Sequence, residues 1–217
     1  NAFDGVSPEE EGNLIADYKK GLVADWKIKN FNLDDLYIRF FRLAEKRIAE
    51  HGGRGVVSFI SNFSFLGDPS YVVMRQSLAS HFDRLWFDCL NGDSRETGKL
   101  TPDGKPDPSV FSTEWNREGI RVGTAIATLV RKTQEPKPQV LFRQFWGTKK
   151  REELVASLAA KDFDAQYQAA TPNKDNRYSF KPSDISNSYL KWPRLVELCN
   201  RPPFAGVAED RSKALIS

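Results

Sequence analysis

Cysteine and histidine are scarce in this chain of 217 residues, which contains two of each: Cys89, Cys199, His51 and His81. The two cysteines are far apart in apolar surroundings, and neither has the close Cys or His neighbour that a zinc site requires. Two histidines also leave little material for a His-based catalytic triad. We therefore expect no metal site, and thiols that stay reduced, as they do in the cytoplasm.

The chain also lacks a long hydrophobic run. No apolar stretch approaches the ~20 residues that a membrane-spanning helix needs, and no secretory signal is present. Hydrophobic residues nevertheless make up 40% of the chain and aromatic residues 12%, which is enough for a folded core. We expect a cytoplasmic protein with no membrane partner.

A phosphate-binding loop is missing as well, although "NGDSRETGKLTPDGKPDPSVFSTEW" (91–115) comes near to one. A P-loop has four residues between its glycines and a Ser or Thr after its Lys. Here five residues separate Gly92 from Gly98, and Leu100 follows Lys99. The prolines of this stretch instead indicate a long irregular insertion between two strands, of a kind that is usually functional or disordered.

Charge is unevenly distributed along the chain. Residues 1–130 contain 16 Lys/Arg and 19 Asp/Glu, whereas residues 131–194 contain 13 and 7. The later segment is thus the better candidate for contact with a polyanion. Within it, Lys149, Lys150 and Arg151 open a predicted helix and are candidates for contacts with DNA phosphates, with an ordinary solvated face as the alternative.

Periodicity predicts alternating helices and strands. Leu33, Leu36, Tyr37, Phe40 and Ile48 recur at three- and four-residue steps, which predicts an amphipathic helix over about 33–51. Asp68 is expected to cap a later helix ahead of Pro69, and Thr148 to cap a third. The predicted helices are 7–22, 33–51, one from residue 68, and 148–160; the predicted strands are 54–60, 84–90, 120–132 and 140–146. This order is typical of parallel strands in an α/β sheet.

Three stretches resemble one family closely: "LDDLYIRFFRLAEKRIAEHGGRGVVSFISNFSFLGDPSYVVMRQSLASHFDRLWFDCLNGD" (33–93), "DPSVFST" (107–113) and "VGTAIATLVRK" (122–132). They resemble the part of an N6-adenine DNA methyltransferase that lies after its Asn-Pro-Pro-Tyr/Phe motif. The nearest resemblance is to the methyltransferase module of single-chain restriction-modification enzymes, which also carry nuclease and helicase domains. The resemblance covers about residues 1–132. "LFRQFWGTKKREELV" and "GVAEDRSKALIS" are similar to the downstream segment of these enzymes that leads into the target-recognition region.

The resemblance implies a Rossmann-like sheet whose last strand runs antiparallel between two others. It implies S-adenosyl-L-methionine as cofactor, bound across the carboxyl ends of the strands, and double-stranded DNA as partner, with the target adenine flipped out of the duplex. We therefore expect the C-terminal part of such a sheet over 1–132. Residues 133–217 are expected to be a smaller α+β appendage that begins a target-recognition or coupling region.

One departure from the family is serious. Neither Asn-Pro-Pro-Tyr nor Asn-Pro-Pro-Phe occurs among the 217 residues, and neither does the Gly-rich cofactor loop. "NAFDGVSPEEEG" resembles the family's segment immediately after the catalytic motif. We therefore expect no catalytic residue in this chain, and a fragment that is inactive without the remainder of its parent polypeptide.

Two positions, Phe40 and Phe111, carry the family's other roles onto this chain, and Asn62 and Phe63 are candidates from their place at the end of a strand. Phe40 matches the aromatic position that packs on the cofactor's adenine ring, with core packing as the alternative. Asn62 and Phe63 come after a buried strand and face the expected crevice, although such residues also make turns. Phe111, in "PSVFST", matches the aromatic residue that stacks on the flipped adenine. The alternative there is that Phe111 or Trp115 fastens the long insertion to the body.

Other functions remain open from the sequence. The chain could be a non-catalytic module that contacts DNA or holds neighbouring domains together. An Asn-Pro-Pro-Tyr enzyme can also methylate RNA adenine or a protein glutamine. Nothing in the residues specifies a DNA recognition sequence.

Overall fold

The structure is a computed structural model and describes residues 13–132, 138–183 and 191–193. The chain divides into two compact units, Asn1–Ser183 and Asp184–Ser217. All helices and strands described below belong to the first unit. The stretch "GVAEDRSKALIS", residues 7–12 of the first predicted helix, and Cys199 lie outside the described residues.

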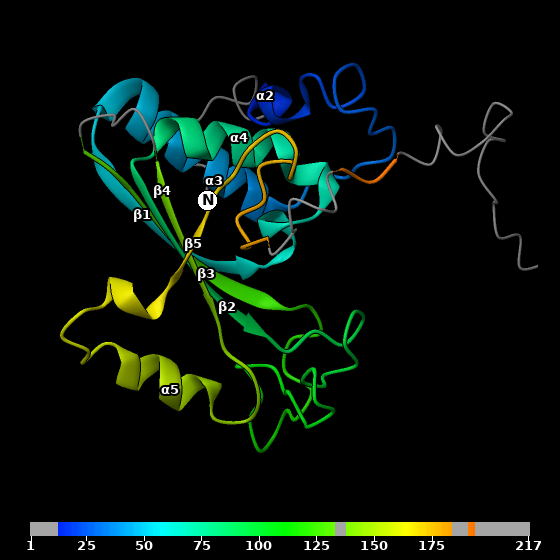
Figure 1. The fold of residues 1–217 in the computed structure, drawn as a ribbon, viewed down its shortest axis with the longest axis vertical. Coiled ribbons are helices and arrows are strands. Elements are labelled where there is room, and N and C mark those ends of the chain that lie inside the picture. Colours follow the sequence, from blue (N-terminus) through cyan, green and yellow to red (C-terminus); the bar gives the residue numbers. More distant parts are fainter. Residues whose placement is uncertain (1–12, 133–137, 184–190, 194–217) are drawn as a thin grey trace, which may run out of the picture. The chain divides into compact units, whose positions relative to one another are not determined.

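A five-stranded mixed sheet forms the centre of the first unit (Figure 1). The spatial order is β1-β3-β2-β4-β5. Strand β3 runs antiparallel to β1 and to β2, β4 runs parallel to β2, and β5 is antiparallel to β4. The strands are β1 Gly55–Asn62, β2 Arg84–Asn91, β3 Thr124–Arg131, β4 Gln139–Gln144 and β5 Gln168–Ala170.

This topology confirms one expectation and corrects another. The predicted antiparallel strand between two others is present, because β3 separates β1 from β2. Strands β1 and β2 run in the same direction, as the element order predicts, but they do not pair with each other because β3 lies between them. The sheet also continues past residue 133, since β4 pairs with β2 in the same compact unit.

Helices cover the two faces of the sheet (Figure 1). One face carries α2 (Ala16–Lys19), α3 (Leu36–Glu45) and α4 (Val72–His81). A π-helical segment, Lys46–Gly52, continues α3 and ends at Gly53, whose φ of +73° suits glycine. The opposite face carries α5 (Lys150–Ser157) and the 3₁₀ turn Asp164–Gln166. Shorter 3₁₀ turns, Ser64–Leu66 and Pro69–Tyr71, precede α4.

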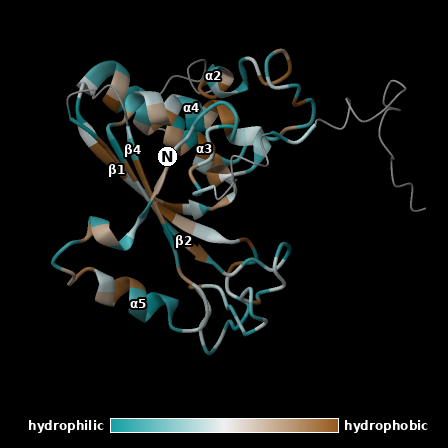
Figure 2. Ribbon diagram, viewed as in Figure 1, coloured by the Kyte–Doolittle hydropathy of each residue, from teal (hydrophilic) through white to brown (hydrophobic). Residues whose placement is uncertain are grey.

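The core lies between the sheet and helices α2, α3 and α4. Phe65 is fully buried and contacts Phe41 from α3 and Phe87 from β2, with ring centroids 5.0 and 5.9 Å apart. Phe87 also stacks on Phe180 at 4.6 Å. Hydrophobic colouring runs along β1 and β2 in Figure 2, as expected for strands that pack on a core.

The buried face of α3 differs from the predicted stripe. Its buried residues are Ile38, Phe41, Arg42 and Glu45, whereas Leu36 is 61% exposed and Phe40 is half-buried. The stripe is displaced because Arg42 and Glu45 enter the interior together as part of a polar cluster. Glu45 accepts hydrogen bonds from Tyr18 Oη at 2.6 Å and Ser77 Oγ at 2.6 Å.

One of the two predicted caps was wrong. Asp68 is the N-cap residue of the turn Pro69–Tyr71, with Pro69 after it as predicted, but its side chain makes no capping hydrogen bond, and α4 begins only at Val72. The predicted cap Thr148 is not the capping residue of its helix. At α5 the N-cap is Lys149, again without a side-chain bond. In the described part of the chain, no helix is long and apolar enough to cross a membrane.

Candidate functional site at the carboxyl ends of the strands

Strands β1, β2 and β4 end at the same edge of the sheet, where β3 begins. Thr124, the first residue of β3, is paired with Asn62 at the end of β1 and with Asn91 at the end of β2. The insertion 92–123 and the start of α5 lie at this edge. Open α/β sheets bind their ligands outside the carboxyl ends of the strands, so this is the candidate site.

Two buried carboxylates fasten the insertion to the sheet, and the first is Asp93. Its Oδ1 accepts the backbone N–H groups of Arg95 at 2.6 Å and Glu96 at 2.7 Å, and its Oδ2 accepts that of Gly123 at 2.7 Å. Burial alone would raise the pKa of Asp93, but these N–H donors hold it below the ordinary value. The two ends of the insertion are therefore joined through one side chain.

Asp107 is the second fastening. Its Oδ2 accepts the N–H of Gly92 at 2.7 Å, and its Oδ1 accepts the N–H of Gly147 at 2.7 Å and lies 2.6 Å from Lys150 Nζ. Lys150 Nζ also donates to the carbonyl of Leu90 at 2.7 Å. The middle of the insertion, the end of β2 and the start of α5 thus meet at one buried ion pair.

This geometry corrects the expectation for Lys150. Its side chain is 2% exposed, and burial lowers its pKa even though Asp107 opposes that shift. A lysine whose ammonium is buried and paired is not available to a DNA phosphate. Lys149 and Arg151, on either side, are exposed.

Gly92 shows why this sequence resembles a P-loop without being one. Its φ is +75°, and a Cβ there would lie 2.9 Å from Ser109 Cα and 3.0 Å from the Pro108 carbonyl oxygen. The glycine is needed because the insertion folds back against it. Its N–H serves the Asp107 carboxylate and not a phosphate.

A cavity of about 380 Å³ opens between the insertion, the sheet and α5. Phe111, 40% exposed, forms part of its wall. Ser112 also lines it, and Ser112 Oγ is buried without a hydrogen-bond partner among the described residues. The other lining residues are Ile60, Leu90, Val110, Thr113, Ile126, Arg151, Leu154 and Val155. A mostly apolar pocket with few polar groups is typical of sites for small organic ligands.

The other predicted base-binding residues lie outside this cavity wall. Asn62 Oδ1 accepts the N–H of Ser64 at 2.9 Å and so makes the turn after β1. Phe63 is 5% exposed, and its ring lies against Gly123, where a Cβ would come within 2.6 Å of it. Lys181 Nζ lies 5.1 Å from the centroid of that ring.

Phe40 is on the opposite face of the sheet from Phe111. Its ring centroid is 6.4 Å from that of Phe59, on β1. Ile60, the next residue of β1, lines the cavity beside Phe111, and successive side chains of a strand point to opposite faces. The structure therefore does not bring Phe40 and Phe111 together.

Sequence reasoning missed the apolar floor of the cavity. Ile60 and Ile126 are neighbours across β1 and β3, and Val155 and Leu154 come from α5. The sequence did carry a signal, because β1 has apolar residues on both of its faces. Such a strand is expected to be covered on both sides, but its own residues do not show which element covers the second face.

Trp115 is not an anchor of the insertion. It is 97% exposed, so it fastens nothing to the described body. The fastening is done by Asp93 and Asp107, whose acidic side chains do not stand out in a polar stretch.

No protein-family model matches the sequence, and no curated protein matches it either. Solved structures do resemble the fold. A cryo-EM structure of a DrdV–DNA complex matches with a TM-score of 0.61 at 20% identity, over 86% of this chain and 18% of that one. The ATP-dependent Type ISP restriction-modification enzyme LlaBIII, bound to DNA, matches with a TM-score of 0.60 at 21% identity, over 82% of this chain and 11% of that one.

A nuclease-deletion mutant of the Type ISP restriction-modification enzyme LlaGI, in complex with a DNA substrate mimic, matches with a TM-score of 0.58 at 20% identity. The match covers 84% of this chain and 16% of the length of that protein. The chain thus spans less than a fifth of each of these proteins. Its mixed α/β fold, with a five-stranded mixed sheet, is similar to part of Type ISP restriction-modification enzymes.

Proposed function

We propose that this chain is the second half of a DNA adenine-N6 methyltransferase domain within a larger restriction-modification enzyme. Phe111 would stack on an adenine flipped out of duplex DNA. The observation that carries the proposal is the cavity beside Phe111 at the carboxyl edge of the sheet. The DNA-bound structures with a similar fold support the choice of partner.

The cavity has the properties that an extruded base needs. Its volume of about 380 Å³ falls in the range of ~300–1,000 Å³ usual for small-molecule pockets. Phe111 offers an aromatic face, and stacking of a base on such a face contributes ~1–3 kcal/mol, which helps to offset the cost of extrusion.

Exposed basic residues beside the cavity fit the DNA backbone. Arg151 lines the cavity, and Lys149 is exposed two residues before it. Each can neutralise a phosphate, which would make affinity fall as salt rises. Lys150 has no part in this contact because it is committed to Asp107.

The cofactor would be S-adenosyl-L-methionine, but these residues do not form a site for it by themselves. Phe40 is the one contact that the resemblance offers, and its half-buried ring lies on the face away from Phe111. The Asn-Pro-Pro-Tyr/Phe motif and the Gly-rich loop are not among the 217 residues. In the complete enzyme the cofactor supplies the methyl group. This chain's part is to hold and orient the base.

A non-catalytic DNA-binding module is the second candidate, because Lys149, Arg151 and the cavity could bind DNA without contributing to a reaction. Methylation of RNA adenine or of a protein glutamine would use the same pocket. The DNA-bound structures favour DNA over both.

Methyl transfer separates these candidates. The isolated chain, incubated with labelled S-adenosyl-L-methionine and DNA, is expected to give no transfer above background. The complete polypeptide that contains it is expected to label adenine in DNA. A complete polypeptide that binds DNA without labelling it would favour the non-catalytic module, and labelled RNA or protein would identify the other substrates.

Phe111→Ala in the complete polypeptide tests the role of the pocket. We expect weaker base flipping, by ~5- to 150-fold in the flipping equilibrium, because one base–aromatic stack is lost. The readout is the fluorescence of a base analogue placed at the methylated adenine. Phe111→Tyr keeps the ring and should behave like the wild type. Equal signals from Phe111→Ala and the wild type would make Phe111 a structural part of the loop.

A further inference from the structure

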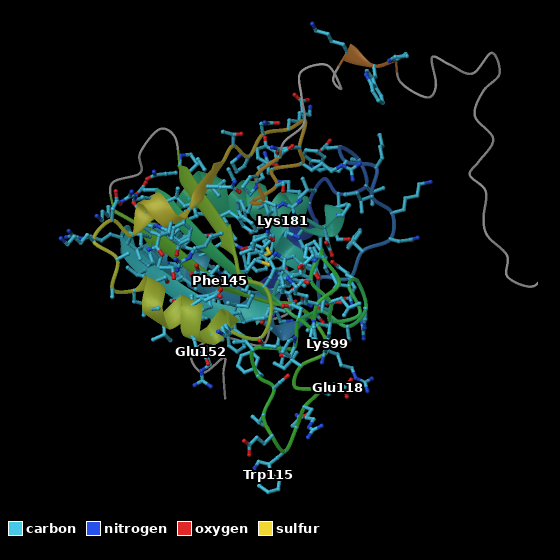
Figure 3. The ribbon with its side chains drawn as sticks, turned by 60° about the horizontal axis from the view of Figure 1, so that its bottom comes forward. Lys99, Trp115, Glu118, Phe145, Glu152 and Lys181 are labelled. Carbon is cyan, nitrogen blue, oxygen red and sulfur yellow. The ribbon has the colours of Figure 1, made fainter. Side chains whose placement is uncertain are left out.

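Trp115 stands at the tip of the insertion with 97% of its surface exposed, the highest value among the large hydrophobic residues that the structure describes (Figure 3). Figure 3 shows it beyond Lys99 and Glu118, pointing away from the body of the unit. An indole ring in water gains nothing from the fold. Its position leaves the ring accessible to a partner.

The turn that presents Trp115 is held in shape by its own hydrogen bonds. The N–H of Thr113 donates to the carbonyl of Asn116 at 2.9 Å, and the N–H of Asn116 donates to Thr113 Oγ1 at 2.9 Å. The N–H of Gly119 donates to Asn116 Oδ1 at 3.0 Å. Lys99 Nζ donates to the carbonyl of Glu118 and ties the turn to the preceding part of the insertion.

The same turn is joined to the cavity. Gly119 has a φ of +59°, and a Cβ there would lie 2.8 Å from Ser112 N and 3.0 Å from the Phe111 carbonyl carbon. Ser109 Oγ accepts the N–H groups of Phe111 and Ile120, both at 3.3 Å. The tip and the cavity wall are thus two parts of one structured segment, with Phe111 in the wall and Trp115 outside it.

We propose that Trp115 inserts into the DNA duplex beside the extruded adenine, an inference that rests on the proposed function. Apolar side chains that enter a base step unstack it and occupy the space that opens. Trp115 has the shape and exposure for this, and the insertion holds it at a fixed place relative to Phe111. Arg117, two residues on and exposed, is placed to meet a phosphate beside the insertion point.

The residues around Trp115 favour DNA over a protein partner. Its neighbours at the tip are Glu114, Asn116, Arg117 and Glu118, all polar and exposed. Protein interfaces surround such a ring with further apolar contacts, which this tip does not have. Arg121 pairs with Glu118 at 2.8 Å and so reduces its repulsion of phosphates.

The experiment compares four forms of the complete polypeptide: wild type, Trp115→Ala, Trp115→Phe and Trp192→Ala. Trp192 is a second exposed tryptophan, outside the insertion, and serves as the matched control. Plasmid DNA is relaxed by a topoisomerase in the presence of each form, because an inserted ring unwinds DNA and changes its linking number. Affinity for a labelled duplex and methyl transfer to DNA are measured on the same preparations.

We expect the wild type, Trp115→Phe and Trp192→Ala to unwind the plasmid alike. Trp115→Ala should lose most of the unwinding per bound protein and bind the duplex about 10-fold more weakly, as for the loss of one stacking contact. If the wild type methylates DNA while Trp115→Ala unwinds it equally, the insertion of Trp115 is wrong and the proposed function stands. If the wild type neither binds nor methylates DNA, both proposals fail.

Discussion

Lys149 and Lys150 are adjacent lysines with opposite environments. Lys149 is exposed, whereas Lys150 is buried against Asp107, which is itself fully buried. The difference arises because α5 begins where Asp107 of the insertion lies against the end of β2, so that adjacent side chains face solvent and interior. Chemically identical residues in one basic run therefore have different roles.

This contrast predicts unequal effects of truncation. Lys150→Ala should lower the free energy of unfolding by about 3–5 kcal/mol, because it leaves Asp107 charged and buried without its counter-ion. Lys149→Ala should change it by less than about 0.5 kcal/mol, as for an ordinary surface substitution. Urea unfolding followed by circular dichroism measures both. Equal values for the two variants would show that the ion pair does not hold the insertion.

At the scale of elements, a polar cluster joins helices α2, α3 and α4. Glu45 of α3 is fully buried and accepts hydrogen bonds from Tyr18 of α2 and Ser77 of α4, and its Oε1 lies 2.7 Å from His81 Nδ1. Arg42 Nη1 lies 3.2 Å from the same carboxylate. Burial pushes the pKa of Glu45 up, but the bonds from His81, Ser77 and Tyr18 and the charge of Arg42 bring it below 4.5.

The lowered pKa predicts a pH dependence. A carboxyl group whose folded pKa is depressed stabilises the fold above its unfolded pKa, and that contribution is lost as pH falls through the folded value. We therefore expect Glu45→Gln to be destabilised by about 3 kcal/mol or more at pH 7. Its deficit relative to the wild type should shrink as the pH falls below 4.5, the ordinary value. Urea unfolding at a series of pH values is the measurement.

Glu50→Gln is the control within the same cluster. Glu50 also pairs with Arg42, at 2.7 Å, but its side chain is 39% exposed. Glu50→Gln should lower the free energy of unfolding by no more than about 1 kcal/mol. A deficit of Glu45→Gln that stays constant from pH 7 to pH 3 would contradict the assignment of the pH dependence to Glu45.

At the scale of the whole sheet, β1 pairs with β3 on one side only, so in the described residues its other edge is open. The outward face of this strand carries Val56 and Ile60, which are 63% and 50% exposed. An open strand edge with apolar side chains is a template for association. In the proposed parent enzyme, the other half of the sheet would continue from this edge.

The open edge predicts that the isolated chain self-associates. Val56→Lys should shift it toward monomer, because a lysine on an edge strand opposes pairing with a second chain. Val23→Lys, at another exposed valine that lies outside the sheet, should leave association unchanged. Sedimentation velocity over a range of concentrations follows both. A wild-type chain that is monomeric throughout would remove β1 as an association surface.

The sequence by itself determined four of the five strands, the main helices and the place of the insertion, whereas the short strand β5 was not predicted. Each of these depends on local periodicity, on Gly and Pro punctuation, or on short apolar runs, so the residues of one segment are enough to predict it. The resemblance in "PSVFST" also singled out Phe111, which lines the cavity.

The tertiary structure alone decided which residues work together. It buried Lys150 and left Lys149 exposed, moved the buried face of α3 onto Arg42 and Glu45, and placed Phe40 and Phe111 on opposite faces of the sheet. These outcomes depend on contacts between segments distant in sequence, such as Gly147 N with Asp107 Oδ1, and no local pattern records them. The physical reason is that burial of a charge is decided by its partner, and here each partner comes from another part of the chain.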